Sequence, residues 1–337
     1  MIRVGLLGAG NISDTHARAA KAIPGVEIAA VFGSNREKVE RLAATYGGAV
    51  YDDLGRFLDH RPLEVVAIGS PSGLHADQTI AALGRGLHVI AEKPLDVTTA
   101  KVDAVIAEAD RRGVKVGVFF QDRLKPDIAA MKKLIEAGRV GSPIFASGRV
   151  RWFRPPEYYA ASRWRGTWGL DGGGALMNQG IHTVDLLHWL FGPVAQVAAR
   201  TATRLHSIEV EDTAAAVIEF ASGALGVVEA TTSSYPGYAR RLDVSGSEGT
   251  LVLEGDRLVG IDLRDQAQRA EAPEQIPENA SSPTVSDSSA HQRVFEDFLG
   301  AIKDGRTPAC DAREARHSVA IIEAIYRSAR SGKFERP

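Results

Sequence analysis

The sequence predicts an α/β fold in which an N-terminal doubly wound parallel sheet is followed by an α+β domain with a mostly antiparallel sheet. Its 337 residues exceed what one hydrophobic core usually organises, so two domains are expected. Over residues 1–122, short apolar runs alternate with segments of helical spacing, which is typical of βαβ units. Over residues 123–337, β-prone runs follow one another with few helices between them, which indicates antiparallel pairing. The C-terminal helices are free to pack back on the first domain.

Five strands are predicted for the first domain, and the first ends in a glycine-rich turn. In "GAGNIS", Gly8 permits a tight turn, Gly10 lets the backbone approach a pyrophosphate, and the helix from Asn11 points free N–H groups at that anion. Ser13 stands where this fingerprint has a third Gly or Ala, so the match is imperfect. Because the motif follows a strand and precedes a helix, we favour a dinucleotide site over a structural turn. The strands are "IRVGLLG" (2–8), "VEIAAVF" (26–32), "LEVVAIGS" (63–70), "GLHVIAE" (86–92) and "VKVGVFF" (114–120).

The end of the second strand bears on the choice of cofactor. An NAD site usually carries Asp or Glu about 20 residues beyond the glycines, but this strand runs into "VFGSNREK". Ser34, Asn35, Arg36 and Lys38 offer hydroxyl, amide and cationic groups that suit a 2′-phosphate. We therefore expect NADP, with NAD as the alternative. Arg36 and Lys38 could instead form a solvated helix face.

Two further loops follow later strands at the edge where ligands of such sheets bind. They are "GSPSGLH" (69–75) and "AEKPL" (91–95). Pro94 disfavours helical geometry at Lys93, so the strand stops and holds Lys93 at its tip, although a lysine here could also be merely solvated. The residues expected to contact the cofactor are Gly8, Gly10, Asn11, Ile12, Ser34, Asn35, Arg36, Lys38, Ser70, Pro71, His75, Glu92, Lys93 and Gln121.

The second domain begins with a helix over 125–141 and continues with six predicted strands. Residues 264–289 lack periodicity and predict a surface loop. Two helices, "AHQRVFEDFLGAIKDG" and "REARHSVAIIEAIYRSARSG", close the chain. The strands are "PIFASGRVRWF", "PVAQVAARTATRL", "TAAAVIEFA", "ALGVVEATTSS", "RRLDVSGSEG" and "TLVLEG".

A polar stripe marks the helix predicted in "DGGGALMNQGIHTVDLLHWL" (171–190). Asn178, His182 and Asp185 stand at i, i+4 and i+7 and share one helical face. Burying such groups without partners costs about 1–3 kcal/mol each, so the face should meet a cavity. The alternative is a packing role, with His182 bonded to a backbone carbonyl. No metal is expected, because His182 and His188 are six residues apart on different faces.

The segment "GRVRWFRPPEYYAASRWRGTW" (148–168) interleaves arginines with aromatic residues. Aromatic rings stack on sugar rings and arginines bind carboxylate or phosphate, which permits a sugar acid or a nucleotide sugar. A solvated face with structural arginines is the alternative. Tyr235 and Tyr238 are further candidates for lining a cavity.

The composition excludes several classes of partner. The 40 Lys and Arg residues against 42 Asp and Glu give a net charge of -2, which does not favour nucleic acid or a membrane surface. Cys310 is the single cysteine, and the chain opens with "MIRVGLLGAG" rather than a basic segment and an apolar run. No window is apolar enough to span a membrane. These features indicate a cytoplasmic protein.

Taken together, the glycine turn, "AEKPL" and "GGGALMNQGIHTVDLL" resemble the Gfo/Idh/MocA family of NAD(P)-dependent oxidoreductases. The resemblance continues through "AIKDGRTP" to "AIYRSARSGK" and so covers nearly the whole chain. It implies an N-terminal Rossmann domain and a second domain built on a large, mostly antiparallel sheet. It also implies a homodimer or homotetramer formed through the open face of that sheet.

The resemblance implies roles for individual residues. Lys93 corresponds to the family's lysine near the nicotinamide and the substrate hydroxyl, and His182 to its acid or base. Asn178 stands where the family often has Asp, which puts a shared Asp–His relay in doubt, so Asn178 would bind a hydroxyl or orient the ring. Asp185 would contact substrate or fix the tautomer of His182. The substrate contacts expected are Lys93, Arg151, Trp164, Arg165, Asn178, His182, Asp185 and Tyr235.

The implied reaction transfers a hydride between the nicotinamide and a secondary hydroxyl or ketone of a sugar, cyclitol or sugar derivative. His182 would move the hydroxyl proton, and Lys93 would stabilise the developing alkoxide. One alternative is glycoside cleavage with retained NAD and transient oxidation at C3. Another is a non-catalytic, cofactor-sensing protein, against which the presence of both Lys93 and His182 argues.

Overall fold

The computed structural model describes residues 1–265, 267–269 and 287–337. Most of the loop expected over 264–289 therefore lies outside the described residues. The chain divides into two compact units. The first comprises Met1–Gln121 and Thr284–Arg316, and the second comprises Asp122–Pro283 and His317–Pro337.

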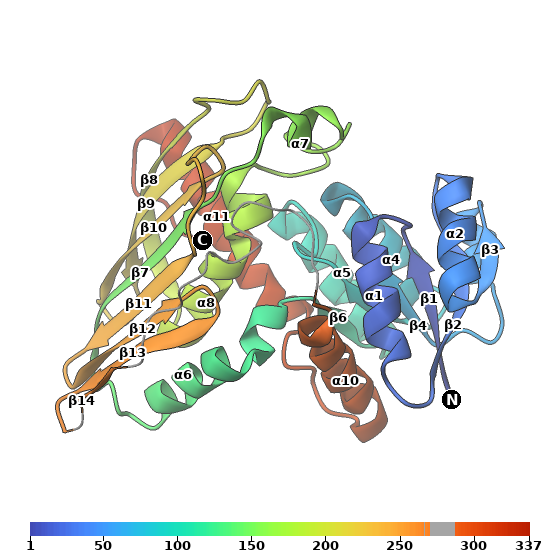
Figure 1. The fold of residues 1–337 in the computed structure, drawn as a ribbon, viewed down its shortest axis with the longest axis horizontal. Helices are drawn as coiled ribbons and strands as arrows, with labels where there is room; N and C mark the ends of the chain where they lie inside the picture. The colour runs from blue at the N-terminus through green and yellow to red at the C-terminus, as the bar shows by residue number, and fades with distance from the viewer. Residues whose placement is uncertain (266, 270–286) are drawn as a thin grey trace. The chain divides into compact units, whose positions relative to one another are not determined.

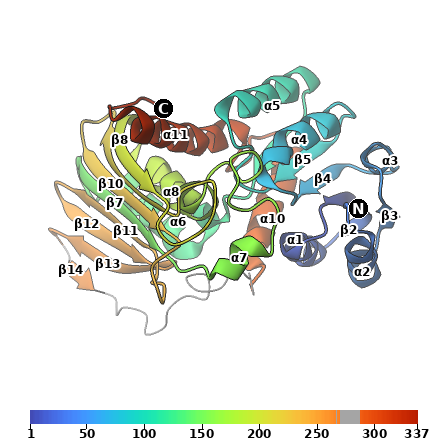
Figure 2. The same ribbon diagram turned by 90° about the horizontal axis from the view of Figure 1, so that it is seen from above.

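The first unit is built on a six-stranded parallel sheet in the order β3-β2-β1-β4-β5-β6 (Figure 1). Helices α4 and α5 pack on one face, and α1 and α10 on the other (Figure 2). The two faces are thus both covered, which explains why all four residues of β4 are buried. The strands are β1 (Ile2–Leu7), β2 (Val26–Phe32), β3 (Ala49–Tyr51), β4 (Val65–Ile68), β5 (His88–Ala91) and β6 (Val116–Val118).

The five predicted strands of this unit form, and the sheet gains an edge strand, β3. Its three residues are exposed or half-buried, so they carry no apolar pattern that would predict a strand. The helices are α1 (Asn11–Lys21), α2 (Arg36–Tyr46), α3 (Leu54–Leu58), η1 (Ser72–Leu74), α4 (His75–Leu83), α5 (Thr99–Arg112) and α10 (Ser289–Asp304).

The second unit contains an eight-stranded sheet in the order β14-β13-β12-β11-β7-β10-β9-β8. Only β7 and β10 pair in parallel, and the other neighbours pair antiparallel, so the mostly antiparallel sheet expected from the sequence is confirmed. The strands are β7 (Pro143–Arg151), β8 (Val194–Ala202), β9 (Thr213–Phe220), β10 (Leu225–Thr231), β11 (Arg241–Gly246), β12 (Gly249–Glu254), β13 (Arg257–Leu263) and β14 (Ala267–Arg269).

One face of this large sheet packs against α8, and the opposite face, here called the open face, carries exposed apolar side chains such as Val217 and Leu225. On β7, Ala146 and Val150 are buried, and Gly148 leaves room for α8: a Cβ there would lie 2.6 Å from a Thr183 methyl carbon and 2.9 Å from a Leu187 methyl carbon. The residues between them on β7 point the opposite way. The remaining helices are η2 (Gln121–Leu124), which spans the division between the units, α6 (Pro126–Glu136), α7 (Pro156–Ala160), the π-helix η3 (Ala175–Gly180), α8 (Ile181–Phe191) and α11 (Ala312–Ser331).

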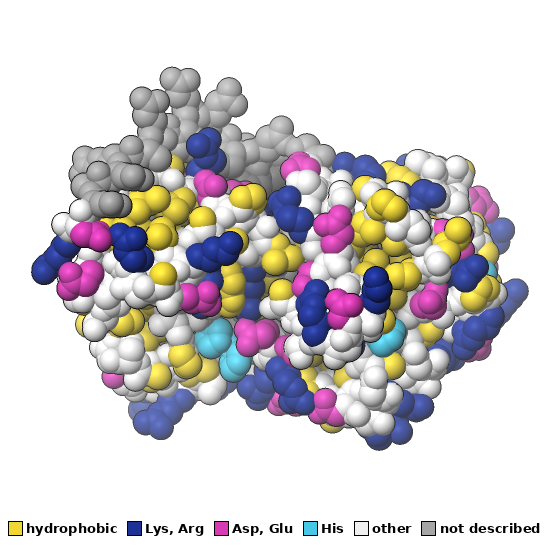
Figure 3. All heavy atoms as spheres, turned by 90° about the horizontal axis from the view of Figure 1, so that it is seen from below, with side chains coloured by type: hydrophobic (Ala, Val, Ile, Leu, Met, Phe, Trp, Pro, Cys, Tyr) yellow, Lys and Arg dark blue, Asp and Glu magenta, His cyan; other side chains and the backbone are white. Residues whose placement is uncertain are grey.

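On the surface drawn in Figure 3, basic and acidic side chains are mixed with apolar ones, as a net charge of -2 leads one to expect. Among the described residues, no helix has the length and apolar character needed to cross a bilayer.

Candidate cofactor and active-site residues

The turn after β1 has the geometry that a pyrophosphate requires. Gly8 has a φ of +117°, and a Cβ there would lie 2.7 Å from the carbonyl oxygen of Gly69. A Cβ on Gly10 would meet no protein atom within 4 Å, so the space beside this residue is open. Gly10 precedes α1 and provides no side-chain cap, which leaves the first N–H groups of the helix to an external acceptor. The residues here fit a dinucleotide.

Ser13 explains why the imperfect glycine fingerprint still folds. Its side chain is buried, and its Oγ lies 2.9 Å from the position a Cβ on Gly8 would take and 3.1 Å from that on Gly69. The small side chain thus fills the contact between helix and strand that a third glycine or alanine usually makes.

The tip of β2 is free of carboxylates, but Asn35 and Arg36 already have partners. Asn35 caps α2, accepting a hydrogen bond from the Lys38 N–H at 3.0 Å. Arg36 is exposed and pairs with Glu40 at 2.7 Å, with Asp52 3.8 Å away. These acids offset the positive charge that the sequence had offered to a 2′-phosphate.

The loops after β4 and β5 are tied together by one histidine. His75 is buried, and its ring nitrogens lie 2.7 Å from the Pro94 carbonyl oxygen and 2.8 Å from that of Ser70. Ser70 also donates to Gln78 at 2.6 Å. His75 therefore joins the two loops, and its role at the cofactor remains a prediction. Lys93 is half-buried directly beyond β5, at the predicted place.

In the second unit, the polar helix predicted from the sequence is two helices. Residues 175–180 form the π-helix η3, and α8 begins at Ile181. The wider turn of η3 changes the spacing between Asn178 and His182, so the 3.6-residue periodicity expected there does not hold. Asn178 donates to Asp171 at 2.6 Å and accepts from Gln179 at 3.0 Å. Asn178 is thereby oriented within a polar network.

Asp185 lies at the centre of a buried ion pair. Its carboxylate accepts from Arg123 Nε and Nη2 at 2.8 and 2.7 Å and from the Ser318 hydroxyl at 3.1 Å. Its side chain is 1% exposed. The geometry is that of a group fixing α8, and a contact of Asp185 with substrate remains a prediction.

The carboxylate beside His182 is Asp122, which the sequence did not single out. Asp122 Oδ2 lies 3.7 Å from His182 Nδ1. The same carboxylate pairs with the buried Arg240 and, at 2.6 Å, with Lys125. Burial acts to raise the pKa of Asp122, but the charges of Arg240, Lys125 and His182 outweigh it and hold that pKa well below its usual range. Asp122 is therefore an anion next to the imidazole.

Arg165 lies over the rings of Tyr158 and Trp164, and Gln179 links Asn178 to Tyr158. The Arg165 guanidinium lies 4.2 Å from the Tyr158 ring centroid and 5.3 Å from that of Trp164. Gln179, which bonds Asn178, also donates to the Tyr158 hydroxyl at 3.0 Å. Three of the predicted substrate residues thus belong to one arginine and aromatic cluster.

Arg151 and Tyr235 are not brought into this cluster by any contact seen among the described residues. Arg151 alternates with the buried Val150 and therefore points to the open face of the sheet, away from α8, where it pairs with Glu229 at 2.9 Å. Tyr235 is 77% exposed and packs edge-on against Phe153 at 5.3 Å. We leave both out of the proposed site.

Sequence reasoning also missed Arg123, Asp171 and Glu211 as organisers of the site. Glu211 accepts hydrogen bonds from the Gly174 and Leu176 N–H groups at 3.0 and 2.9 Å, and so holds the start of η3. The signal for Asp122 and Arg123 was their place in "QDRLKP", directly beyond the last strand of the parallel sheet.

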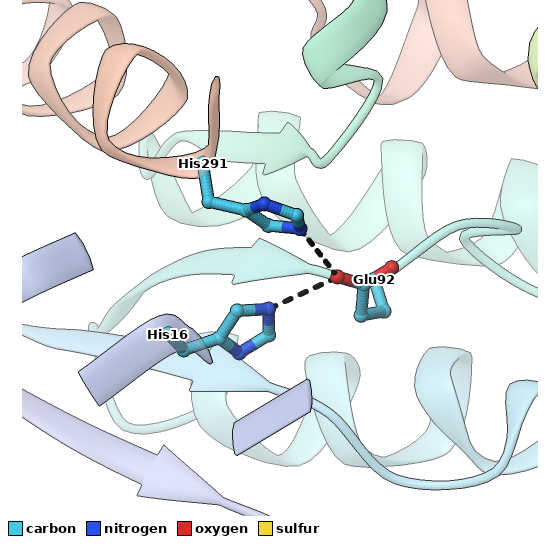
Figure 4. A group of neighbouring side chains, drawn as sticks. All are labelled: His16, Glu92 and His291. Atoms are coloured by element: carbon cyan, nitrogen blue, oxygen red, sulfur yellow. Dashed lines mark hydrogen bonds and ion pairs between the residues drawn. The ribbon is translucent and has the colours of Figure 1, made fainter. Parts of the chain in front are cut away.

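The sequence predicts no metal site. Within the described part of the chain, one group of three side chains could hold an ion: His16, Glu92 and His291, all in the first unit (Figure 4). None of the polar residues of η3 and α8 belongs to it.

Comparison with known proteins agrees with this geometry. Residues 2–120 match the model described as oxidoreductase family, NAD-binding Rossmann fold. Residues 128–252 match the Gfo/Idh/MocA C-terminal domain.

Relatives extend the match over the whole chain. D-apiose dehydrogenase of Paraburkholderia graminis is 28% identical over 335 residues, covering 97% of this chain and 88% of that protein. Inositol 2-dehydrogenase of Rhizobium meliloti is 25% identical over 342 residues, with 97% and 96% covered. The WlbA dehydrogenase of Bordetella pertussis, solved with NADH and UDP-GlcNAcA, is 34% identical with a TM-score of 0.88 over 100% of this chain and 98% of that one. The protein therefore belongs to the Gfo/Idh/MocA family of NAD-binding oxidoreductases.

Proposed function

We propose that this oxidoreductase transfers a hydride between a nicotinamide and a secondary hydroxyl or ketone of a sugar, cyclitol or sugar derivative. The observation that carries the proposal is the half-buried imidazole of His182 held beside the ionised carboxylate of Asp122. An imidazole can accept a proton on one ring nitrogen and return it, which is what a general acid and base requires. The family membership supplies the class of reaction.

His182 is the proposed acid and base. In the oxidative direction the hydroxyl proton must be removed by a base within about 3 Å of the oxygen. The Asp122 carboxylate favours the imidazolium that results, because an anion about one contact distance away stabilises a new positive charge. In the reductive direction the same ring donates the proton to the carbonyl oxygen.

Lys93 is the proposed stabiliser of the alkoxide. As an ammonium group it would donate hydrogen bonds to an oxygen that gains negative charge in the transition state. The bound nicotinamide supplies the chemistry that a side chain lacks, since it accepts or gives the hydride. Gly8, Gly10 and the N-terminus of α1 are proposed to hold its pyrophosphate.

NADP is the proposed cofactor, with NAD as the alternative. The tip of β2 carries Ser34 in place of the acid that usually binds the 2′-hydroxyl of NAD and repels a 2′-phosphate. Glu40 and Asp52 beside Arg36 weaken the case for strict NADP specificity. We therefore propose a preference rather than an exclusive choice.

The substrate is proposed to carry a carboxylate or phosphate in addition to its hydroxyls. The Arg165, Tyr158 and Trp164 cluster supports this, because a guanidinium binds an anion while the rings stack on a sugar. The WlbA relative was solved with UDP-GlcNAcA. Nucleotide-activated sugar acids are therefore the first substrates to test.

The open face of the large sheet is the proposed subunit interface. Phe145, Val217, Leu225 and Val227 lie on it and are 41%, 45%, 51% and 37% exposed. The strand register places Leu225 beside Phe145 and Val227 beside Val217, so these side chains form one apolar patch. We expect a homodimer or homotetramer by light scattering, and a monomer would contradict this assignment.

The reaction is tested by following absorbance at 340 nm with NADP⁺ and NAD⁺ against sugars, cyclitols, sugar acids and nucleotide sugars. Saturable formation of reduced cofactor with at least one of them supports the proposal. Cofactor that copurifies, never exchanges and shows no net reduction would favour the glycoside-cleaving alternative. Exchangeable cofactor without turnover on any class would favour a sensing role.

A further inference from the structure

Three buried polar side chains meet in the core of the first unit and take no part in the proposed chemistry. His16 comes from α1, Glu92 from the residue after β5, and His291 from α10 (Figure 4). They are 0%, 8% and 2% exposed. A carboxylate this deeply buried is costly unless hydrogen bonds compensate it, so the cluster needs a physical reason.

The two rings converge on one carboxylate oxygen. His16 Nε2 lies 3.0 Å from Glu92 Oε1, and His291 Nε2 lies 3.6 Å from the same atom. Figure 4 marks both contacts with dashed lines, and a protonated Nε2 on each ring would aim an N–H at that oxygen. The first contact is a hydrogen bond and the second is a longer electrostatic contact.

The Glu92 carboxylate is ionised in this cluster. Burial acts to raise the pKa of Glu92, but the contacts with His16 and His291 outweigh it and hold that pKa well below its usual range. Burial lowers the pKa of His16, against the opposing effect of Glu92. The cluster is thus an anion held by N–H donors, with a neutral His16 ring.

The other carboxylate oxygen is turned towards the loop that carries Lys93. Glu92 Oε2 accepts a hydrogen bond from the Lys93 backbone N–H at 3.2 Å. Downstream, the Pro94 carbonyl oxygen accepts from His75. Rotation of the Glu92 carboxylate would therefore change the geometry at the backbone of Lys93 directly.

Hydrogen bonding accounts for the cluster better than a metal ion does. The group offers three ligands, one fewer than structural zinc takes. A catalytic zinc with three protein ligands would need a fourth position open to substrate or water. Apolar rings close the site: Phe119 stacks on His16 at 4.3 Å, and Phe295 lies edge-on to His16 at 6.2 Å.

We propose that His16 and His291 are positioning residues that clamp the Glu92 carboxylate, so that its second oxygen fixes the backbone of Lys93. The inference rests on the catalytic role proposed above for Lys93. Helix α10 lies far along the chain from Glu92. Through His291 it would affect activity by contacts that all lie within the first unit. The rings act through Glu92 and need not touch substrate or cofactor.

The first test does not depend on turnover. Hydrogen–deuterium exchange of the Lys93 amide is measured in the full-length wild type, His291→Phe, His291→Gln and Phe295→Leu. We expect the Lys93 amide to exchange about tenfold faster in His291→Phe, which keeps a buried ring but loses the N–H. The Gln variant, which retains a donor, should recover most of the protection. Phe295→Leu, also on α10, loses packing without losing a donor to Glu92 and should leave this amide unchanged.

The second test uses kinetics on whichever substrate the panel identifies. A misplaced catalytic group can cost up to about a hundredfold, so kcat should fall about 10- to 100-fold in His291→Phe and in His16→Phe. KM for the cofactor should stay within about threefold of the wild type, since the glycine turn is untouched. The His291→Gln variant should recover kcat.

Unchanged Lys93 exchange in His291→Phe would overturn the inference even if the enzyme is an active dehydrogenase. Equal effects of His291→Phe and Phe295→Leu would also overturn it, because a general loss of packing would then suffice. One equivalent of zinc or another divalent metal per chain in purified wild type, absent from His16→Gln, would assign the cluster to metal binding instead. Failure of every substrate in the panel would contradict the proposed function without changing the exchange result.

Discussion

Each unit of the molecule places an imidazole beside a buried carboxylate, but the two carboxylates are compensated in different ways. Glu92 is held by His16, His291 and a backbone N–H. Asp122 is paired with the cations Arg240 and Lys125, and His182 lies 3.7 Å from it.

The difference bears on the two proposed roles, His16 and His291 as positioning residues and His182 as acid and base. His16 and His291 are buried and face the Glu92 carboxylate, so removing either ring takes away one of the contacts that compensate a buried anion. Asp122 is also paired with the cations Arg240 and Lys125, and the His182 side chain is 12% exposed. The proton transfer proposed for His182 would therefore leave Asp122 paired with Arg240 and Lys125.

The largest expected effect is on turnover in the second unit. His182→Ala should lower kcat by about 10²–10⁴-fold, the usual contribution of a general acid or base. Its free energy of unfolding should change by less than about 1 kcal/mol, because Arg240 and Lys125 still compensate Asp122. Steady-state rates and urea titrations measure the two quantities.

The matched control is His188→Ala on the same helix, where the ring stacks on His317 at 4.4 Å. It should keep wild-type kcat. Retained activity in His182→Ala, or equal losses in both variants, would remove His182 from the chemistry.

Arg240→Met should have the largest effect on stability. It takes the buried cation from Asp122 and Asp256, and breaking a buried pair costs about 3–5 kcal/mol. Lys125 remains, so we expect the lower end of that range. Arg241→Met is the control: its partner Asp243 lies 3.0 Å away and the Arg241 side chain is 36% exposed, so about 1 kcal/mol or less is expected. Equal losses in the two variants would contradict the burial argument.

Glu211 extends the comparison to a carboxylate compensated only by neutral donors. Burial raises the pKa of Glu211 to about 7, despite hydrogen bonds from the Leu176 and Gly174 N–H groups and from Tyr326. The folded state therefore binds the proton more tightly than the unfolded state, and the stability this contributes is complete below about pH 4.5. It is lost as pH rises through about 7.

The loss between pH 5 and pH 8 should be about 2–3 kcal/mol in the wild type. Urea titrations at both pH values measure it. Glu211→Gln cannot ionise and should show a flatter dependence, after subtraction of the change common to both proteins. Parallel curves would show that Glu211 does not titrate in this range.

Adding a carboxylate at the cofactor site should produce a smaller effect. Ser34→Asp should shift the ratio of kcat/KM for NADP against NAD by about tenfold towards NAD, because an acid there repels a 2′-phosphate and accepts from a 2′-hydroxyl. Ser34→Ala controls for loss of the hydroxyl. An unchanged ratio would mean that the tip of β2 does not set the preference.

The smallest effect is expected for the exposed pair between Arg151 and Glu229. A surface ion pair contributes about 0–1 kcal/mol, and Arg151 lies on the sheet face opposite α8. Arg151→Ala should leave kcat/KM within about twofold of the wild type. A tenfold fall would return Arg151 to the list of substrate contacts.

Features that depend on residues close together in the sequence could be predicted, and those that depend on distant residues could not. The five strands predicted for the first sheet, the six predicted for the second and the turn at Gly8 have local signals, namely apolar runs and glycines, and they are confirmed. The strands β3, β13 and β14 were not predicted, and β14 lies within the loop expected over 264–289. The alternation in "GRVRW" places Arg151 and the buried Val150 on opposite faces of the strand, so the orientation of Arg151 away from α8 could also have been predicted.

The partners of the buried carboxylates could not be predicted in the same way. Asp122 and Arg240 are 118 residues apart, and Glu92 meets rings from both α1 and α10. Such pairs depend on the packing of distant elements and leave no periodicity in the sequence. The π-helical turn before His182 likewise arises from its surroundings, including the carboxylate of Glu211.

The central claim is that a nicotinamide dinucleotide binds at the turn after β1, and fluorescence titration of the wild type with NADPH and NADH tests it most directly. Saturable binding at one site per chain, tighter for NADPH and lost on substituting Gly10 with a bulky residue such as Trp, is the result we predict. Absence of binding by either cofactor, to protein that also contains none after purification, would contradict the claim and every role proposed for Lys93 and His182.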